Sequence, residues 1–297
     1  MKTLIDLSTY QPFLKNNTLA QKLERAEVRV ATHVDLQPTK EKLAFTLAEV
    51  LITLGIIGVV AAMTIPTLIS SQQKRAAVTG IKEAQSILNQ AIKLYTADTD
   101  EDGSLSFDTK LPIDEFAQKY FVPYLKIARI CTQMSDGCWQ TGDFNGYYDL
   151  AGVKMTNTVP YSIVLNNGMI LGFNQVAGVD PDGIPYNIVS IIVDINGKSG
   201  RNTMGKDVFS FYLFNNENSS LKTEQIKNGI YPGGFANGGV PHIQYSREKL
   251  LSTTVERGCN KKATRLAYEG NRPGVGTACT AVIFKDGWQI ANDYPWN

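Results

Sequence analysis

An apolar run from Phe45 to Ile69 constrains this chain more than any other feature of its sequence. The run reads FTLAEVLITLGIIGVVAAMTIPTLI, and Glu49 is its only charged residue. A helix of this length, at about 1.5 Å per residue, crosses a hydrocarbon core about 30 Å thick. It differs from a cleavable secretory signal, which starts near the N-terminus and has a shorter apolar region. We therefore predict that residues 45–69 form a helix that spans a membrane once.

Glu49 is an unusual residue at this place. An ionised carboxylate costs roughly 2.5–3.5 kcal/mol on insertion scales when it lies centrally in a membrane helix. Such a side chain usually has a partner, and the apolar run contains no lysine, arginine or histidine. A free α-amino group at Phe45, created by proteolysis and supplied by a neighbouring copy, would serve as that partner.

The residues at the start of the run resemble a known motif. The sequence AFTLAE over residues 44–49, preceded by Lys42 and followed by the apolar run, resembles the cleavage and methylation motif of type IV prepilins and type II secretion pseudopilins. The resemblance implies that prepilin peptidase cuts between Ala44 and Phe45 and methylates the new N-terminus at Phe45. It also implies that Glu49 guides subunit docking. Members of that family usually have glycine before the cut, where this chain has Ala44.

The motif divides the chain into four predicted parts. Residues 1–44 are a cytoplasmic leader that the peptidase removes, unless translation starts later than Met1. Residues 45–69 are the membrane half of a spine helix, residues 70–97 are its amphipathic half, and residues 98–297 are an extracytoplasmic head. In the amphipathic half, the apolar positions predicted to share one face are Ile81, Ala84, Leu88, Ala91 or Ile92, and Tyr95.

Four cysteines lie downstream of the apolar run, at Cys131, Cys138, Cys259 and Cys279. Their even number fits two disulfides in an oxidising compartment, and the Cys-x-x-Cys spacing of zinc and redox motifs is absent. The simplest pairing joins Cys131 to Cys138 and Cys259 to Cys279, although the sequence allows three pairings. Four unpaired buried thiols are the alternative.

Two loops carry acidic residues that suit calcium. The first, DTDEDGSL from residue 98, starts like an EF-hand loop, and the second surrounds the sequence DING from residue 194. The tentative ligands are Asp98, Asp100 and Asp102 in the first loop and Asp194, Asn196 and Asp207 in the second. Thr109 replaces the glutamate expected at the twelfth position of the first loop, and Asx residues before glycine also form ordinary turns. A solvated acidic turn is therefore the alternative in the first loop, and an ordinary Asx turn is the alternative in the second.

The head sequence predicts short helices followed by an antiparallel sheet. Residues 113–130 suggest two short helices with a break before Pro123. The sequence Asn166-Asn167-Gly168 between two apolar runs indicates a hairpin. The predicted strands are residues 161–165, 169–173, 188–195, 208–214, 280–284 and 287–291. We expect an α+β fold of the pilin type, in which a long N-terminal transmembrane and amphipathic spine helix packs against an antiparallel β-sheet head.

Charge and histidine content exclude several functions. Lysine and arginine total 29 and aspartate and glutamate total 28, so we expect no strong nucleic-acid binding. The two histidines, His33 and His242, each stand apart from any nucleophile or zinc motif. We therefore expect that the chain is not an enzyme.

The resemblance implies a filament subunit with three kinds of protein partner: prepilin peptidase, other pilin or pseudopilin subunits, and an inner-membrane assembly platform. The precursor would span the cytoplasmic membrane once, with the head outside the cytoplasm, and would enter a periplasmic or cell-surface filament. A head of roughly 200 residues is large for a major pilin and favours a minor or pseudopilin role. The alternative is a single-pass, membrane-anchored binding module or adhesin that does not polymerise.

Overall fold

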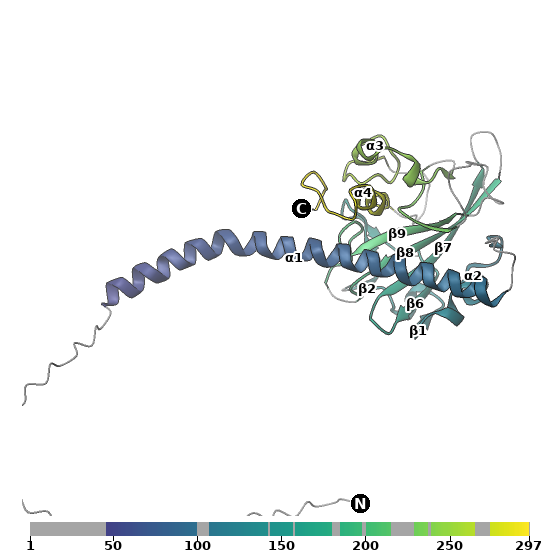
Figure 1. The fold of residues 1–297 in the computed structure, drawn as a ribbon, viewed down its shortest axis with the longest axis horizontal. Coiled ribbons are helices and arrows are strands. Elements are labelled where there is room, and N and C mark those ends of the chain that lie inside the picture. Colours follow the sequence, from purple (N-terminus) through teal and green to yellow (C-terminus); the bar gives the residue numbers. More distant parts are fainter. Residues whose placement is uncertain are drawn as a thin grey trace, which may run out of the picture. The chain divides into compact units, whose positions relative to one another are not determined.

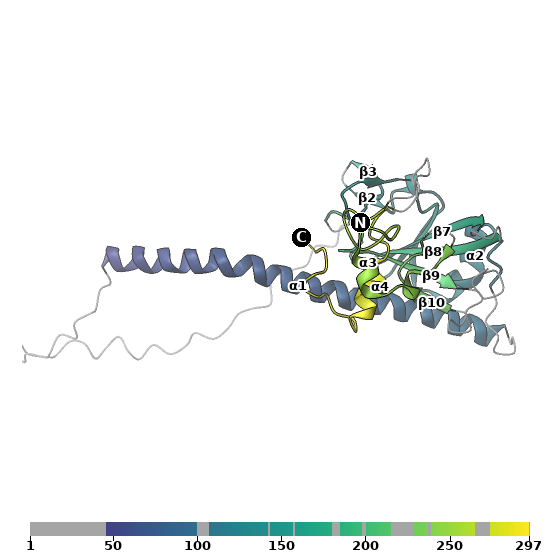
Figure 2. The same ribbon diagram turned by 90° about the horizontal axis from the view of Figure 1, so that it is seen from above.

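A computed structural model describes residues 46–99, 107–141, 143–156, 158–179, 185–197, 200–214, 229–236, 239–264 and 274–296. The chain divides into two units, Met1–Ile57 and Gly58–Asn297. In the first unit the described residues begin at Thr46 and form the start of helix α1. The second unit contains the rest of α1 and the head, drawn in Figures 1 and 2. The predicted leader, residues 1–44, lies outside the described residues.

Helix α1 spans Leu47–Asp98 without interruption, with Pro66 inside it. The predicted continuation of the helix over residues 70–97 is therefore confirmed. From Ala77 onward one face of α1 is buried, because its small and apolar side chains pack on the head. The buried residues of α1 are Ala77, Gly80, Ile81, Ala84, Leu88, Ala91, Ile92 and Tyr95. They include every position that the periodicity predicts for the buried face.

The head is built on a six-stranded antiparallel sheet with the strand order β1-β6-β7-β8-β9-β10. The strands are β1 Ile127–Cys131, β6 Tyr161–Leu165, β7 Ile170–Val179, β8 Pro185–Asp194, β9 Val208–Phe214 and β10 Gly229–Pro232. From β7 to β10, each strand pairs with the strand before it in the sequence. The predicted hairpin at Asn166-Asn167-Gly168 is confirmed, because Ser162 lies opposite Gly172 and Val164 opposite Ile170.

Both faces of this sheet are covered. On one face lie α1, α2 (Ile113–Tyr120) and α4 (Cys279–Lys285), as Figures 1 and 2 show together. On the other face lie Trp139, the disulfide loop before it, and two short hairpins, β2 (Gln140–Thr141) with β3 (Phe144–Asn145) and β4 (Tyr147–Tyr148) with β5 (Lys154–Met155). The alternation of side chains divides β8 between the two cores, with Ile191 on the α1 side and Ile192 on the Trp139 side.

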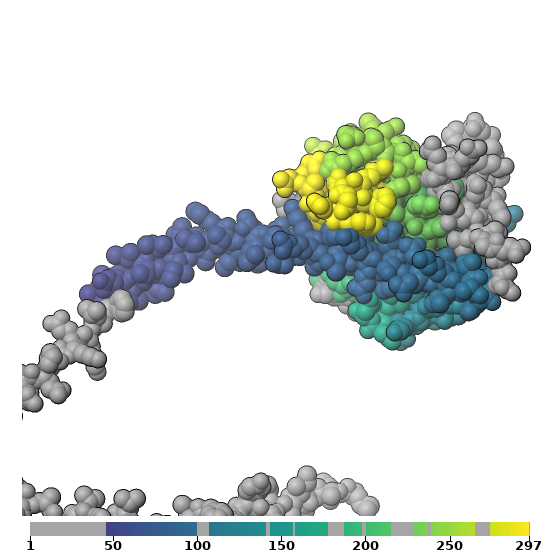
Figure 3. All heavy atoms as spheres, in the orientation of Figure 1, coloured from purple at the N-terminus to yellow at the C-terminus, as the bar shows by residue number. Residues whose placement is uncertain are grey.

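The C-terminal residues complete the core on the α1 side. Tyr294 and Trp296 are 4% and 8% exposed, and the Tyr294 hydroxyl donates a hydrogen bond to the Gly205 carbonyl at 2.6 Å. In Figure 3 the C-terminal segment, in yellow, lies directly beside the second part of α1, in blue. Arg247, which begins the short helix α3 (Arg247–Leu251), binds the carboxylates of Asp286 and Asp293 and holds this segment in place.

Two predicted strands are wrong. Residues 280–284 lie in helix α4, and residues 287–291 form a loop instead of a paired strand. The reason lies at Gly287, which has φ 68° and ends α4, while the Trp288 N–H donates to the Ile283 carbonyl at 2.8 Å. Glycine in the left-handed conformation after the last helical turn is a common helix C-terminus. The Asp286-Gly287 pair is thus a helix end and not a hairpin turn.

The second of the two helices predicted within residues 113–130 is also wrong. Helix α2 ends at Tyr120, and Pro123 lies in one 3-10 turn, Val122–Tyr124. The chain then enters strand β1, which pairs antiparallel with β6. Proline ends the α-helical segment as expected, and hydrogen bonding to β6 determines the conformation beyond it.

Candidate functional site

The apolar helix begins with a reciprocal pair of hydrogen bonds between Thr46 and Glu49. The Thr46 N–H and hydroxyl donate to Glu49 Oε2 at 2.8 and 2.9 Å, and the Glu49 N–H donates to Thr46 Oγ1 at 3.2 Å. This arrangement is a capping box, which satisfies backbone N–H groups that have no carbonyl partner in the first turn. Glu49 was predicted from the sequence as a docking residue and Thr46 was not, although Thr-x-x-Glu is the sequence signature of this cap.

The first part of α1 exposes large apolar side chains on all sides. Leu47 is 78% exposed, Met63 72% and Ile52 62%, and no residue between Leu47 and Ile69 is buried. The hydroxyls of Thr53 and Thr64 donate to the carbonyls of Val50 and Val60, so they add no free polar group. Among the described residues, α1 is the one helix long and apolar enough to cross a membrane.

Pro66 lies within the same apolar part of α1. A proline has no N–H group, so the carbonyl four residues earlier loses its helical hydrogen bond. Membrane helices tolerate this loss when neighbouring groups satisfy the carbonyl. The proline is therefore compatible with the helix and marks a position where a neighbouring helix or side chain can compensate.

Both predicted disulfides are present in the head. Cys131 is bonded to Cys138 and Cys259 to Cys279, which selects the local pairing among the three that the sequence allows. The first bond closes a loop that ends next to the buried Trp139, whose indole N–H donates to the Ser162 hydroxyl at 2.7 Å. The second fixes the first residue of α4. The disulfides therefore stabilise opposite faces of the sheet.

The first candidate calcium loop is described only at its start. Asp98 is the last residue of α1, whereas Asp100 and Asp102 lie outside the described residues. The Asp98 carboxylate hydrogen-bonds with Tyr124, whose pKa is raised by burial and by that carboxylate. Asp98 thus has a contact within the head that needs no metal, and calcium at this loop stays a prediction.

The second candidate loop brings Asp194 and Asp207 into one hydrogen-bonded turn. Asp194 accepts hydrogen bonds from the Asn196 N–H at 3.1 Å and from the Asn202 amide at 2.7 Å, and Asp207 accepts one from the Thr203 N–H. Burial raises the pKa of Asp194 to about 8 and that of Asp207 to about 6.

Both carboxylates are therefore occupied by the turn, which is the alternative that the sequence left open. Within the described residues, no group of three or more His, Cys, Asp or Glu side chains is placed to hold a metal ion. Calcium at Asp194, Asn196 and Asp207 also stays a prediction.

His242 has a structural environment. It is completely buried, its Nδ1 accepts a hydrogen bond from the Gly234 N–H at 3.2 Å, and its Nε2 lies 3.0 Å from the Glu256 carbonyl oxygen. These contacts suit a neutral imidazole that donates from Nε2, and burial lowers its pKa to about 3. His242 therefore connects two backbone segments.

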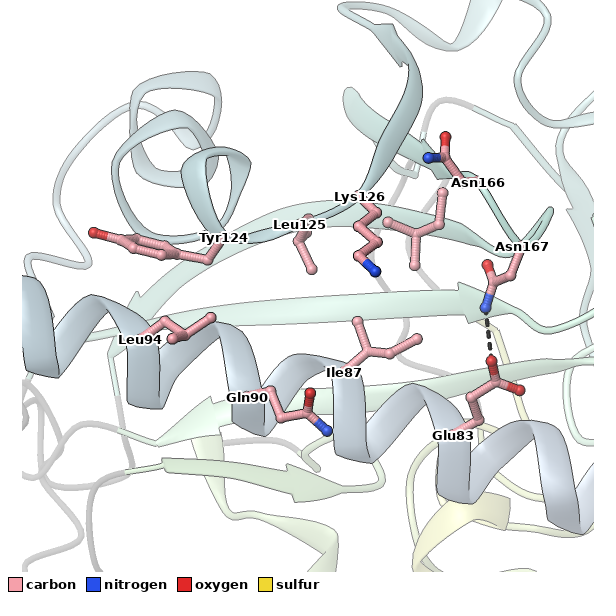
Figure 4. A pocket seen from close by; sticks show the side chains of 10 residues that line it. Glu83, Ile87, Gln90, Leu94, Tyr124, Leu125, Lys126, Asn166 and Asn167 are labelled. Atoms are coloured by element: carbon pink, nitrogen blue, oxygen red, sulfur yellow. Dashed lines mark hydrogen bonds between the residues drawn. The ribbon is translucent and has the colours of Figure 1, made fainter.

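A pocket of about 570 Å³ lies beside the second part of α1 and is shown in Figure 4. We call it the α1 pocket. Its lining residues are Glu83, Ile87, Gln90 and Leu94 from α1, Tyr124, Leu125 and Lys126 from the segment before β1, and Leu165, Asn166 and Asn167 from the β6–β7 hairpin. One end is closed by a hydrogen bond of 2.8 Å from the Asn167 amide to Glu83. No sequence pattern indicates this pocket, because it is formed by three segments that are far apart in the chain.

These features define a class of protein. It is an α+β protein whose disulfide-bonded head is continuous with a helix long and apolar enough to cross a membrane. A protein-family model, described as DUF6613, a family of unknown function, matches residues 67–297 of the chain. The chain therefore belongs to this family. No curated protein and no solved structure matches the chain. The family match starts after Pro66, so it covers the head and not the motif at residues 44–49.

Proposed function

We propose that the chain is the precursor of a filament subunit of the type IV pilin and type II secretion pseudopilin type. Prepilin peptidase cuts it between Ala44 and Phe45 and methylates the amino group of Phe45. The mature subunit then assembles through the apolar part of α1, with Glu49 as the docking residue. Calcium is not required for this role.

One observation carries the proposal: an α-helix that is apolar on all sides starts with a single carboxylate, directly after a sequence that resembles a prepilin cleavage site. An all-round apolar helix needs an apolar environment on every side. A bilayer provides it for the precursor, and the helices of neighbouring subunits would provide it in a filament. Cutting before Phe45 leaves Thr46 and Glu49 in the mature chain, so the capping box is preserved.

The head supports a location outside the cytoplasm. Two disulfides suit an oxidising compartment, because cytosolic thiols are normally kept reduced. In this proposal the apolar segment anchors the precursor in the cytoplasmic membrane until the assembly platform transfers it to a periplasmic or cell-surface filament. The size of the head favours a minor or pseudopilin subunit, and we assign the chain no catalytic residue.

Processing provides the first test. The full chain is co-expressed with a prepilin peptidase, and the product is analysed by N-terminal sequencing and intact mass. We expect an N-terminus at methylated Phe45. Ala44→Gly, which installs the usual residue of the family, should be cut at least as fast, whereas Ala44→Leu should be cut poorly. An uncut wild-type chain beside an efficiently cut reference prepilin would refute the proposal.

Assembly provides the second test. Glu49→Ala should be processed normally but should fail to enter filaments or enter them weakly, because the docking carboxylate is lost. Thr53→Ala is a matched control one turn further along the same helix, since the Thr53 hydroxyl is already satisfied by the Val50 carbonyl. Sheared filaments are quantified by immunoblot against total processed subunit. Equal incorporation of the Glu49 variant would remove the docking role.

A membrane-anchored binding module that does not polymerise is the competing function. The same long apolar helix would serve it equally well as an anchor. The two functions differ in what happens after membrane insertion. Recovery of the processed chain only from the membrane fraction, in cells whose assembly platform builds other filaments, would favour the anchored module.

A further inference from the structure

The α1 pocket has the shape and lining of a binding groove for a second helix. The side chains that α1 contributes follow a spacing of four, three and four residues, so they form one stripe about 16 Å long at 1.5 Å per residue. Opposite this stripe lie Leu125 and the buried Leu165, and Leu94 is 51% exposed. Figure 4 shows that apolar groups from both walls face the space between them. An apolar side chain that enters the pocket from solvent would be shielded from water by α1 on one side and by Leu125 and Leu165 on the other.

The pocket lining contains two charged side chains, Lys126 and Glu83, and Glu83 already accepts the Asn167 hydrogen bond at one end of the pocket. In Figure 4 the amine of Lys126 points into the pocket, on the side of Ile87. In the described part of the chain Lys126 forms no ion pair. An apolar ligand whose single carboxylate lies beside Lys126 would therefore complement this side of the pocket in charge.

The chain itself contains a segment with these properties. Glu49 is the only charged residue of the apolar run, and Ile52 and Ile56 follow it on the same side of the helix, 62% and 60% exposed. Glu49, Ile52 and Ile56 are separated by three and four residues. Ile87, Gln90 and Leu94 have the same separations. In a parallel helix pair this register places Glu49 beside Ile87 and Lys126, and Ile56 beside Leu94. Interdigitated rows at such spacings are the usual way in which two helices pack.

We propose that the α1 pocket receives the start of the apolar segment, residues 47–56, of a second copy of this chain, and that Lys126 is the counter-charge of the Glu49 carboxylate from that copy. The inference rests on the proposed function, because the segment leaves the membrane only when subunits assemble. In this arrangement Lys126 shares the Glu49 carboxylate with the amino group of Phe45. The partner is thus a neighbouring subunit, displaced by 38 residues along the helix axis, about 57 Å at 1.5 Å per residue.

A charge exchange tests the pair in cells that assemble the wild-type filament. Lys126→Glu should lower incorporation by about tenfold or more, because removing one partner leaves the other charge unpaired in apolar surroundings. The double variant Lys126→Glu with Glu49→Lys should assemble better than Glu49→Lys alone, because it restores an opposite charge at position 126 although not the contact of position 49 with the amino group of Phe45. Lys110→Glu, an exposed lysine outside the pocket, is the matched control and should behave like wild type. Normal assembly of Lys126→Glu overturns the inference and leaves the proposed function intact, whereas failure of wild-type processing overturns the proposed function.

Photocrosslinking keeps the inference testable if the lysine at position 49 blocks membrane insertion. A benzoylphenylalanine placed at Gln90, inside the pocket, should give a covalent dimer, and mass spectrometry should map the crosslink to the peptide Phe45–Lys74 of the second copy. The same group at Lys82, exposed on α1 but outside the pocket lining, should crosslink that peptide much less. A Gln90 crosslink to another protein, or to the head of the second copy, overturns the inference.

Discussion

Gly80 is the position where the packing of α1 on the sheet can be tested most directly. It is a buried glycine inside a helix, where alanine would normally be preferred by about 1 kcal/mol. A Cβ added at Gly80 would lie 2.9 Å from Cβ and 3.0 Å from Cδ1 of Ile195, the residue directly after β8. The Cβ of Ile195 is fixed by its backbone, so rotation of the side chain cannot remove the closest contact. Overpacking of this kind costs about 1–3 kcal/mol, and the rigid contact favours the upper half of that range.

The net expectation for Gly80→Ala is therefore a destabilisation of about 1–2 kcal/mol. For a head of this size, each 1 kcal/mol lowers the melting temperature by about 2–4 °C. The assay is thermal unfolding of the full chain in detergent, followed by near-ultraviolet circular dichroism of the buried aromatic residues. Gly58→Ala on the same helix is the control, since a Cβ there meets no atom within 4 Å. An unchanged or raised melting temperature for Gly80→Ala would refute the close approach of α1 to β8.

Three further predictions concern the head and use the same melting assay. Replacing Cys259 and Cys279 together by alanine should lower the free energy of unfolding by about 3 kcal/mol, because the disulfide closes a loop with a sequence separation of 20. A melting temperature equal to that of the wild type would contradict this prediction. Tyr294→Phe should cost about 1–2 kcal/mol, because it leaves the buried Gly205 carbonyl without its 2.6 Å hydrogen bond, and a neutral effect would mean that another donor replaces the hydroxyl. Burial raises the pKa of Asp194 from 3.8 to about 8, so the folded state favours the protonated carboxyl. The stability that this protonated form contributes is fully present below pH about 4 and is lost as the pH rises through about 8. The wild-type melting temperature should fall from pH 5 to pH 8, and Asp194→Asn, which cannot ionise, should fall less; parallel curves would contradict the assignment.

The sequence was most informative where one periodicity dominated. The amphipathic stripe of α1 predicts its buried face, and the hairpin at residues 161–173 and strand β9 follow from strong turn and β-branched signals. Helix α4 shows where such reasoning fails. Its residues Cys279 to Ile283 are all buried, so the segment has no polar face and its sequence has no helical period. A short apolar run of this kind fits a strand and a buried helix equally well.

The candidate site was predictable only where its residues are neighbours in the sequence. Thr46 and Glu49 form a readable capping signature, and the local disulfide pairing was the simplest choice. The α1 pocket could not be predicted, because Ile87 and Lys126 meet only after β1 has paired with β6. Only tertiary packing brings a lysine to an apolar pocket wall.

The strand order of the head determines how it would fold if it is exported as we propose. From β7 to β10 each strand pairs with its predecessor, so a chain that crossed a membrane from its N-terminal side could build the sheet one strand at a time as it emerged. Local pairings of this kind form quickly, since little loop entropy has to be lost. The folding head is most exposed to aggregation when β9 has just formed. All seven residues of β9 are buried in the finished head, and the elements that cover them, β10 and α4, come last in the chain. A head stalled before residue 229 would present this apolar strand with an open edge, so completion of the last third of the head is the step that protects the folding chain from aggregation.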